Sequence, residues 1–190
     1  KGDTVLDVCA APGTKSLFIS EIIGCKGKVY AYDNNEQRIK TAKSDLLRNS
    51  LNNIIWGKKD AKTDFYPISK KILIDAPCTG TGVIGKKPDI KWRRNPRDIK
   101  EMSELQFQIL QNMSKFLEIG GIMIYSTCSI EKEENWDVVE LFLKYNVNFK
   151  LVKITNFQYP EWIDSNGCLM TIPHIHKVSG IFAAKLNKYA

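Results

Sequence analysis

The chain has little histidine and no closely paired cysteines, and these shortages argue against several kinds of site. Its 190 residues include only two histidines and five cysteines, and no two cysteines form a C-x-x-C pair. Zinc sites in proteins need ligands at short, characteristic spacings, so we expect no metal ion. An odd number of unpaired cysteines is also typical of a reduced, intracellular protein rather than a disulfide framework.

Long apolar runs are missing as well. The longest stretches, such as residues 121–125, hold a handful of residues, whereas a helix that spans a bilayer needs about 20. We therefore predict neither a membrane segment nor a signal peptide. With 43% hydrophobic residues, the chain is long enough for one domain with a sizeable core and too short for two. We expect a single globular domain that is monomeric.

Acidic residues are in deficit, and the net charge is +7. Most of this excess lies in residues 86–100, where seven basic side chains are accompanied by only two acidic ones. A local cationic segment favours a polyanionic partner such as nucleic acid. A solvated surface loop is the alternative, and charge alone leaves both interpretations open.

Short apolar runs alternate with amphipathic stretches along the chain. Helices are predicted from Ser16 to Ile23, after Asn34 or Asn35 (with Ile39, Ala42, Leu46 and Leu47 on one face), from Met102 to Leu117 before Gly120 and Gly121, and over about 133–145. Strands are predicted at residues 4–8, 28–32, 54–56, 72–74 and 122–125, with weaker candidates near 149–154 and 180–186. This alternation predicts an α/β fold with a doubly wound, mostly parallel sheet.

A loop of small residues and two carboxylates predict a nucleoside-bearing cofactor. Residues 10–13 (Ala-Ala-Pro-Gly) follow the first strand, where backbone can approach a ligand at a helix N-terminus. Asp33 ends the second strand and can bind both hydroxyls of a ribose, and Asp60 ends the third, near an adenine edge. Helix capping is the alternative role for such carboxylates. The chain lacks the P-loop and G-x-G-x-x-G patterns, which favours S-adenosylmethionine over nicotinamide dinucleotides.

Two further blocks end predicted strands, and each carries a cysteine. They are residues 75–78 (Asp-Ala-Pro-Cys) and 126–129 (Ser-Thr-Cys-Ser). Because open parallel sheets place their chemistry at the carboxyl ends of strands, Cys78 and Cys128 are expected to face one substrate. The alternative is a pair of inert, buried thiols.

These blocks resemble the RNA (cytosine-5) methyltransferases, in the order of that family and across nearly the whole chain. The resemblance is closest to the bacterial branch that methylates small-subunit ribosomal RNA. Thr14 departs from the family pattern, which commonly has a second glycine there, and we expect cofactor binding to survive the change. The matching blocks are residues 7–15 (DVCAAPGTK), 75–82 (DAPCTGTG), 88–92 (PDIKW), 126–129 (STCS) and 133–135 (EEN).

The resemblance implies a seven-stranded, Rossmann-like methyltransferase fold and formation of 5-methylcytosine in RNA, ribosomal rather than transfer RNA. Cys128 would be the nucleophile that adds to carbon-6 of cytosine, and Cys78 would assist product release. Asp75 is suited to hydrogen-bond the ring nitrogen of the base. DNA cytosine-5 methyltransferases use a Pro-Cys block for the same addition, so the residues alone leave Cys78 open as the nucleophile. S-adenosylmethionine would be held by Cys9, Ala10, Ala11, Pro12, Gly13, Thr14, Lys15, Asp33, Asp60 and Asp75.

RNA contacts are expected from the cationic segment, at Lys86, Lys87, Lys91, Arg93 and Arg94. Trp92 within it can stack on a base or anchor the loop. The family's cofactor-covering and N-terminal RNA-binding segments are not found here, so we expect a catalytic domain of a longer protein, whose activity in isolation stays open. An RNA substrate implies the cytoplasm in a bacterium and the nucleolus or an organelle in a eukaryote.

A non-catalytic RNA-binding domain with a role in ribosome assembly is the alternative from another class. A nucleobase deaminase shares a Pro-Cys element, at Pro77 and Cys78 here, but needs a zinc-ligand set and an H-x-E motif. The chain has no H-x-E motif, so the deaminase reading is rejected.

Overall fold

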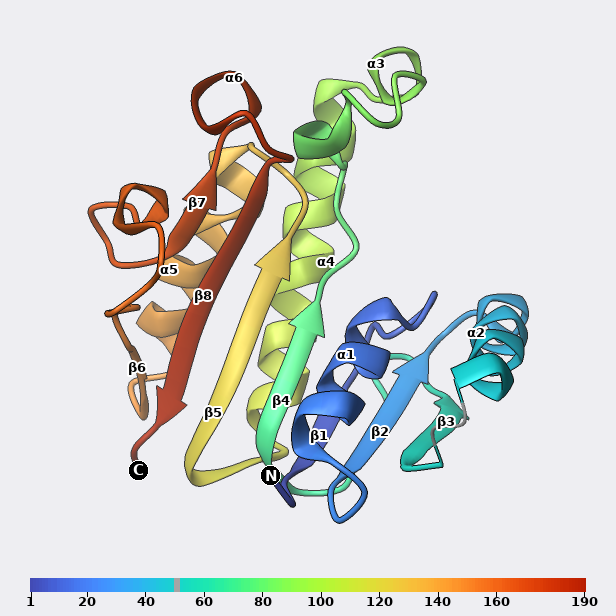
Figure 1. Ribbon diagram of the computed structural model, residues 1–190. Coiled ribbons are helices and arrows are strands. Elements are labelled where there is room, and N and C mark those ends of the chain that lie inside the picture. The colour runs from blue at the N-terminus through green and yellow to red at the C-terminus, as the bar shows by residue number, and fades with distance from the viewer. Residues whose placement is uncertain (50–51) are drawn as a thin grey trace.

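The computed structural model describes residues 1–49 and 52–190, and side chains outside residues 45–51. It is an open sheet of eight strands with helices on both sides (Figure 1). The strands are β1 (Thr4–Asp7), β2 (Lys28–Asp33), β3 (Ile54–Lys58), β4 (Ser69–Asp75), β5 (Leu117–Thr127), β6 (Phe149–Leu151), β7 (Leu169–Thr171) and β8 (Ile181–Lys188). The helices are α1 (Thr14–Ile23), α2 (Glu36–Asn49), α3 (Ile90–Arg93), α4 (Pro96–Ser114), α5 (Trp136–Tyr145) and α6 (Pro173–His176), with short 3-10 helices η1 (Thr81–Val83), η2 (Lys132–Glu134) and η3 (Pro160–Trp162).

The sheet has the strand order β3-β2-β1-β4-β5-β8-β6, and β7 pairs with β8 outside this path. The first five strands pair in parallel, while β8 runs antiparallel to β5, β6 and β7. The predicted doubly wound, mostly parallel α/β fold is therefore confirmed. The sheet has eight strands in this structure because β7 adds to the expected seven. A three-residue strand is too short to leave an alternating pattern in the sequence.

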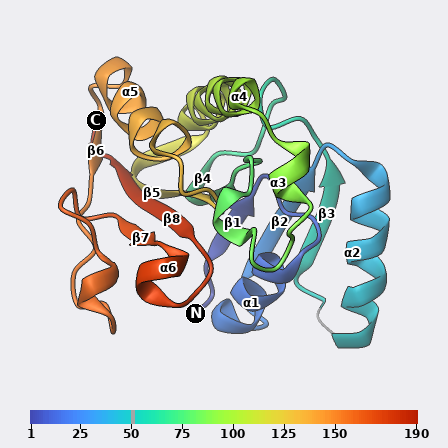
Figure 2. The same ribbon diagram turned by 90° about the horizontal axis from the view of Figure 1, so that it is seen from above.

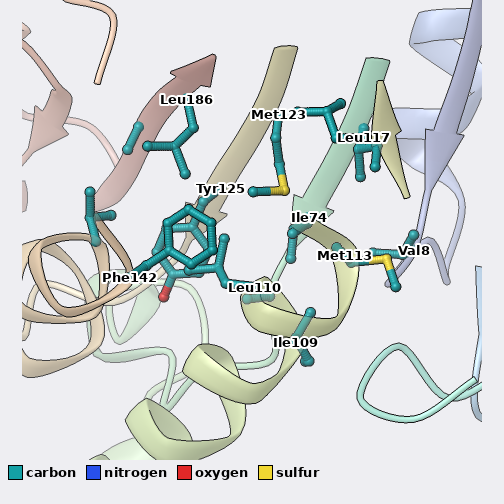
Figure 3. Close-up of a cluster of buried hydrophobic side chains, with 14 of the residues drawn as sticks. Val8, Ile74, Ile109, Leu110, Met113, Leu117, Met123, Tyr125, Phe142 and Leu186 are labelled. Atoms are coloured by element: carbon teal, nitrogen blue, oxygen red, sulfur yellow. The ribbon is translucent and has the colours of Figure 1, made fainter. Parts of the chain in front are cut away.

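Helices α4 and α5 cover one face of the sheet, and α1 lies against the other (Figure 2). The core lies largely between α4 and the sheet, where Leu110 and Met113 of α4 and Met123 and Tyr125 of β5 are fully buried in one cluster (Figure 3). Burial of each such side chain is worth roughly 1.5–3 kcal/mol, so this layer fixes α4 beneath the ends of β4 and β5.

The boundary between α4 and β5 differs from the prediction. The helix begins earlier, at Pro96, because Asn95 and Asp98 form a reciprocal capping box. It also ends earlier, at Ser114, and Leu117 already belongs to β5. The buried Phe116 and Leu117 extended the apolar pattern past the true end of the helix, since core-facing residues of a turn and strand add to the same stripe.

Two sequence predictions concern the helices: the positions of Leu46 and Leu47, and the absence of a membrane-spanning segment. The predicted helical positions Leu46 and Leu47 lie within α2, but their side chains are outside the described set. Within the described residues, no helix combines the length and apolar character needed to cross a membrane.

Candidate active site

A cavity of about 350 Å³ opens at the carboxyl ends of the parallel strands. It is lined by residues at or just after the ends of the first five strands. The predicted cysteines and acidic residues therefore come together in one place. These lining residues include Cys9, Ala11 and Pro12 after β1, Asp33 at the end of β2, Asp60 after β3, Asp75 and Cys78 around the end of β4, and Cys128 after β5.

The loop after β1 turns sharply at Gly13, which has a φ of 106° and donates its N–H to the Ala10 carbonyl at 2.8 Å. A side chain there would be strained and would also press on the ring of Trp56. Thr14 is the first residue of α1 and does not have a positive φ, so its departure from glycine carries no backbone strain. Ala10, Gly13 and Thr14 support the loop and do not line the cavity.

Asp33 is almost completely buried, with 3% of its surface exposed. Its carboxylate accepts the backbone N–H groups of Ala11 at 3.1 Å and Asn35 at 3.0 Å. Arg38 of α2 lies 3.3 Å from the same carboxylate and also donates to the Ala11 carbonyl. Sequence reasoning missed Arg38, which is one of several basic residues on its helix. Asp60 is half-buried, and one of its oxygens accepts the backbone N–H of Lys62 at 2.9 Å.

Asp75 is held between two donors from different elements. Lys15 Nζ of α1 lies 2.5 Å from Asp75 Oδ2, and Ser126 Oγ of β5 donates to Oδ1 at 3.0 Å. The ion pair is partly exposed, so its contribution to stability is small. Its effect is positional, because it brings a positive charge near enough to lower the pKa of Cys128. Lys15 does not itself line the cavity, and its pairing with Asp75 was not predicted.

The sulfur atoms of Cys78 and Cys128 lie 3.1 Å apart. The hydrogen bond between them lowers the pKa of the Cys128 thiol, and the nearby Lys15 ammonium acts in the same direction. The same hydrogen bond raises the pKa of Cys78, as do its burial and the charge of Cys128. Either sulfur could be the donor by geometry, and the opposite shifts of the two pKa values favour a thiolate at Cys128 that accepts a hydrogen bond from a protonated Cys78.

Behind the two cysteines lies a buried polar network that sequence reasoning missed. Thr79 follows Cys78, Ser129 follows Cys128, and both side chains donate to the carboxylate of Glu134 in η2. Glu134 and Ser129 are fully buried. The block at residues 133–135 marks Glu134 as part of the family pattern. Its burial could not be predicted, because burial depends on how distant segments meet.

The cationic segment lies beside the cavity and is folded into α3 and the start of α4. Lys87 lines the cavity, and Lys86 lines a neighbouring groove. Trp92 is 88% exposed, so it does not anchor the loop. Arg94 donates to the Thr79 carbonyl at 3.1 Å and pairs with Asp98, whereas Arg93 pairs only with the exposed Asp89.

The two histidines, Cys25 and Cys168 do not line the cavity. His176 Nδ1 accepts the backbone N–H of Ile172 at 2.8 Å. Cys168 is buried and Cys25 is exposed. Across the part of the chain that the structure describes, no group of three or more His, Cys, Asp or Glu side chains is arranged to hold a metal ion.

A family model and curated relatives match nearly the whole chain. The family model described as 16S rRNA methyltransferase RsmB/F matches residues 1–187. Ribosomal RNA small subunit methyltransferase B of Serratia proteamaculans is 39% identical over 191 residues, which cover 98% of this chain and 42% of that protein. The probable ribosomal RNA small subunit methyltransferase B of Bacillus subtilis is 33% identical, with coverages of 98% and 43%. The chain thus spans less than half the length of these curated relatives.

Solved structures are similar over the same extent. NSun6 from Pyrococcus horikoshii, solved with SFG, has a TM-score of 0.89 and 30% identity, covering 99% of this chain and 48% of that one. A methyltransferase homolog protein from Pyrococcus horikoshii has a TM-score of 0.81 and 31% identity, covering 98% and 62%. Because the family match extends over almost every residue, the chain belongs to the 16S rRNA methyltransferase RsmB/F family.

Proposed function

We propose that these residues form the catalytic domain of an S-adenosylmethionine-dependent enzyme that makes 5-methylcytosine in RNA, through a covalent bond between Cys128 and the base. The observation that carries the proposal is the 3.1 Å separation of the Cys78 and Cys128 sulfurs, in a cavity also lined by Asp33, Asp60 and Asp75. Family membership supports RNA methyl transfer. The names of the Serratia and Bacillus relatives support ribosomal RNA as the substrate.

The cavity has the size and chemistry to hold the methyl donor. Its volume falls in the range of roughly 300–1,000 Å³ that small-molecule sites occupy. A carboxylate has about four acceptor positions, and among the described residues three donors reach Asp33, so it can still accept from a ribose hydroxyl. Leu105 and Ile109 of α4 give the cavity an apolar wall suited to an adenine ring. When bound, the donor supplies an electrophilic methyl group on a sulfonium sulfur.

Cys128 supplies the nucleophile in this proposal. Its thiolate forms a bond to carbon-6 of cytosine, and the electron pair of the carbon-5–carbon-6 double bond becomes available at carbon-5 for methyl transfer. Asp75 lines the cavity with the two cysteines and can hydrogen-bond the base, while Lys15, which pairs with Asp75 from outside the lining, can stabilise charge that develops there. The lowered pKa of Cys128 supports this assignment over Cys78.

Cys78 then completes the reaction. Once Cys128 is bonded to carbon, it carries no charge and accepts no strong hydrogen bond, so these two causes of the raised pKa of Cys78 disappear, while burial still raises it. Cys78, which lines the cavity, can then lose its own proton to solvent water and, as a thiolate, take the proton on carbon-5. The electron pair of that C–H bond re-forms the carbon-5–carbon-6 double bond, and Cys128 leaves carbon-6 as the thiolate.

The RNA is proposed to cross the cationic segment. Lys86, Lys87, Lys91 and Arg93 supply charge for phosphates, and exposed Trp92 supplies a face for base stacking. Arg94 belongs to the same segment, but its guanidinium is already engaged by Thr79 and Asp98. A paired target cytosine would have to be flipped into the cavity. An RNA substrate and free cysteines support an intracellular location, and we propose that the enzyme acts there as a monomer.

The test is methyl transfer from radiolabelled S-adenosylmethionine to ribosomal RNA by the full-length protein. Cys128→Ala is expected to abolish transfer, whereas Cys78→Ser is expected to accumulate a covalent protein–RNA adduct on denaturing gels. Cys25→Ser, at an exposed position away from the cavity, is the control. Unchanged transfer by Cys128→Ala would remove the proposed nucleophile, and absence of donor binding by calorimetry would favour a non-catalytic RNA-binding domain. Bisulfite sequencing of cellular RNA after gene deletion would identify the target.

A further inference from the structure

Glu134 is a charged side chain with no exposed surface, and it lies outside the cavity lining. A buried carboxylate is costly unless hydrogen bonds compensate it, so its partners indicate its role. It belongs to η2, which follows β5 and precedes α5.

The partners of Glu134 come from both cysteine loops. Its Oε2 accepts the backbone N–H of Thr79 at 2.9 Å, and its Oε1 accepts the Thr79 hydroxyl. Oε1 also accepts the hydroxyl of Ser129 at 2.7 Å. Thr79 and Ser129 are the residues that directly follow Cys78 and Cys128. One carboxylate therefore bonds to both loops at the position next to each sulfur.

The direction of these hydrogen bonds can be followed from atom to atom. Ile130 N–H donates to Thr81 Oγ1, so the Thr81 hydroxyl proton is free to be given to Ser129 Oγ at 3.1 Å. Ser129 Oγ also accepts the Glu131 N–H at 3.1 Å, which leaves its own proton for Glu134. The carboxylate thus stands at the end of a chain of donors, where only an acceptor fits.

Helix α4 anchors the same carboxylate. Gln106 is fully buried, and its Nε2 donates to Glu134 Oε2 at 3.0 Å and to the Pro77 carbonyl at 2.8 Å. Pro77 immediately precedes Cys78. The clamp formed by Glu134, Thr79, Ser129 and Gln106 therefore ties both cysteine loops to a helix whose position the core fixes.

We propose that Glu134 is a positioning residue that sets the separation of the Cys78 and Cys128 sulfurs, acting through Thr79 and Ser129 and without touching the substrate. This inference rests on the proposed function for its catalytic consequence. The charge of Glu134 also contributes to the raised pKa of Cys78, which is consistent with a protonated Cys78 facing a Cys128 thiolate. An apolar side chain could fill the same space at lower desolvation cost, so burial alone does not account for a charge here.

The test measures sulfur proximity independently of catalysis, using the full-length protein and diamide as oxidant. The two thiols lose two electrons and two protons to form the Cys78–Cys128 disulfide, and the azo bond of diamide takes up these electrons and protons. Peptide mass spectrometry follows the rate of disulfide formation. Wild type and Glu133→Gln, an exposed neighbour in the same turn, are expected to cross-link equally fast. Glu134→Gln is expected to cross-link at least tenfold more slowly, because its amide presents donors to hydroxyls that already donate.

Activity and binding supply the second readout. For Glu134→Gln we expect kcat for methyl transfer to fall at least tenfold while donor affinity, measured by calorimetry, stays within twofold of wild type. Wild-type cross-linking in Glu134→Gln would overturn the proposal. If that variant does not fold, Ser129→Ala removes one of the four bonds, and an unchanged cross-linking rate there would also overturn it. A wild-type protein without methyl transfer would refute the proposed function, while the cross-linking comparison would still decide the role of Glu134.

Discussion

Cys78 and Cys128 carry the same side chain, yet their surroundings distinguish them. The Lys15 ammonium acts on Cys128, and the Glu134 carboxylate acts on Cys78. Because the sulfurs share a hydrogen bond, their titrations belong to the pair. That hydrogen bond is the largest cause of both pKa shifts, and the Asp75 carboxylate opposes the effect of Lys15 on Cys128. The residue-level consequence is a lowered pKa at Cys128, the residue proposed as the nucleophile.

This asymmetry predicts the pH dependence of thiol alkylation. The pKa of Cys128 is lowered to about 7, so its thiolate fraction should rise as the pH increases through 7. Alkylation of Cys128 by iodoacetamide, followed by peptide mass spectrometry, is expected to have its midpoint there. In Cys78→Ala the hydrogen bond that lowers the pKa is lost, and the midpoint should move upward, towards the ordinary cysteine value of about 8.5.

Exposed Cys25 serves as the internal reference in the same samples. Its alkylation profile should be identical in wild type and Cys78→Ala. A Cys128 midpoint that did not move in Cys78→Ala would contradict the argument, since Cys78 would then contribute nothing to ionisation.

At the level of elements, local pattern predicted most strands and helices, and it failed where tertiary structure adds to the pattern. The stripe that begins at Met102 continues through Phe116 and Leu117, although the helix ends at Ser114. Gly120 was taken as part of a helix stop, but it has a φ of 80° and lies inside β5, where pairing with β4 shifts register. A single sequence records which residues are buried more directly than which element buries them.

The same distinction applies to the candidate site. The rule that strand ends carry chemistry predicted that Asp33, Asp75, Cys78 and Cys128 would share a cavity, and the structure brings them together. Their functional roles remain proposals. The rule could not predict that Glu134 would reach Thr79, because that contact joins segments 55 positions apart through loops without a periodic pattern.

The loop that carries Cys78 is packed against the loop that carries Cys128 at Gly82, and this contact gives a prediction. Gly82 N–H donates to the Cys128 carbonyl at 3.0 Å. A methyl group on Gly82 would lie 2.8 Å from that carbonyl oxygen and closer still to the Gly180 carbonyl. Gly82→Ala should therefore destabilise the fold by about 1–3 kcal/mol in urea unfolding and lower methyl transfer, because the backbone must move apart.

Gly85 lies three residues further along the same loop, and a methyl group there would meet nothing within 4 Å. Gly85→Ala should stay within about 0.5 kcal/mol of wild type. Equal unfolding midpoints for Gly82→Ala and Gly85→Ala would show that the close approach at Gly82 does not constrain the two loops.

At the scale of the whole molecule, basic side chains lie at both ends of the sheet. The cationic segment runs through α3, which lies at the end of the sheet towards which β4 and β5 point (Figure 1). Lys87 of that segment lines the cavity. At the opposite end, Lys71 is paired with Asp3, and Lys70 lies near Glu118. Lys87 therefore carries positive charge on the side from which, in the proposed function, a base would enter.

This distribution predicts how RNA affinity should depend on salt. Each phosphate contact adds roughly 0.7–0.9 to the slope of log affinity against log salt concentration. If Lys87 and Lys91 contact phosphates, replacing both with alanine should lower that slope by roughly 1.4–1.8 in filter-binding titrations with ribosomal RNA. The pair Lys26→Ala and Lys28→Ala removes the same charge at the start of β2, at the opposite end of the sheet, and should leave the slope nearly unchanged. Equal losses from the two double variants would mean that RNA responds to net charge alone, and the cationic segment would then have no specific place in the RNA path.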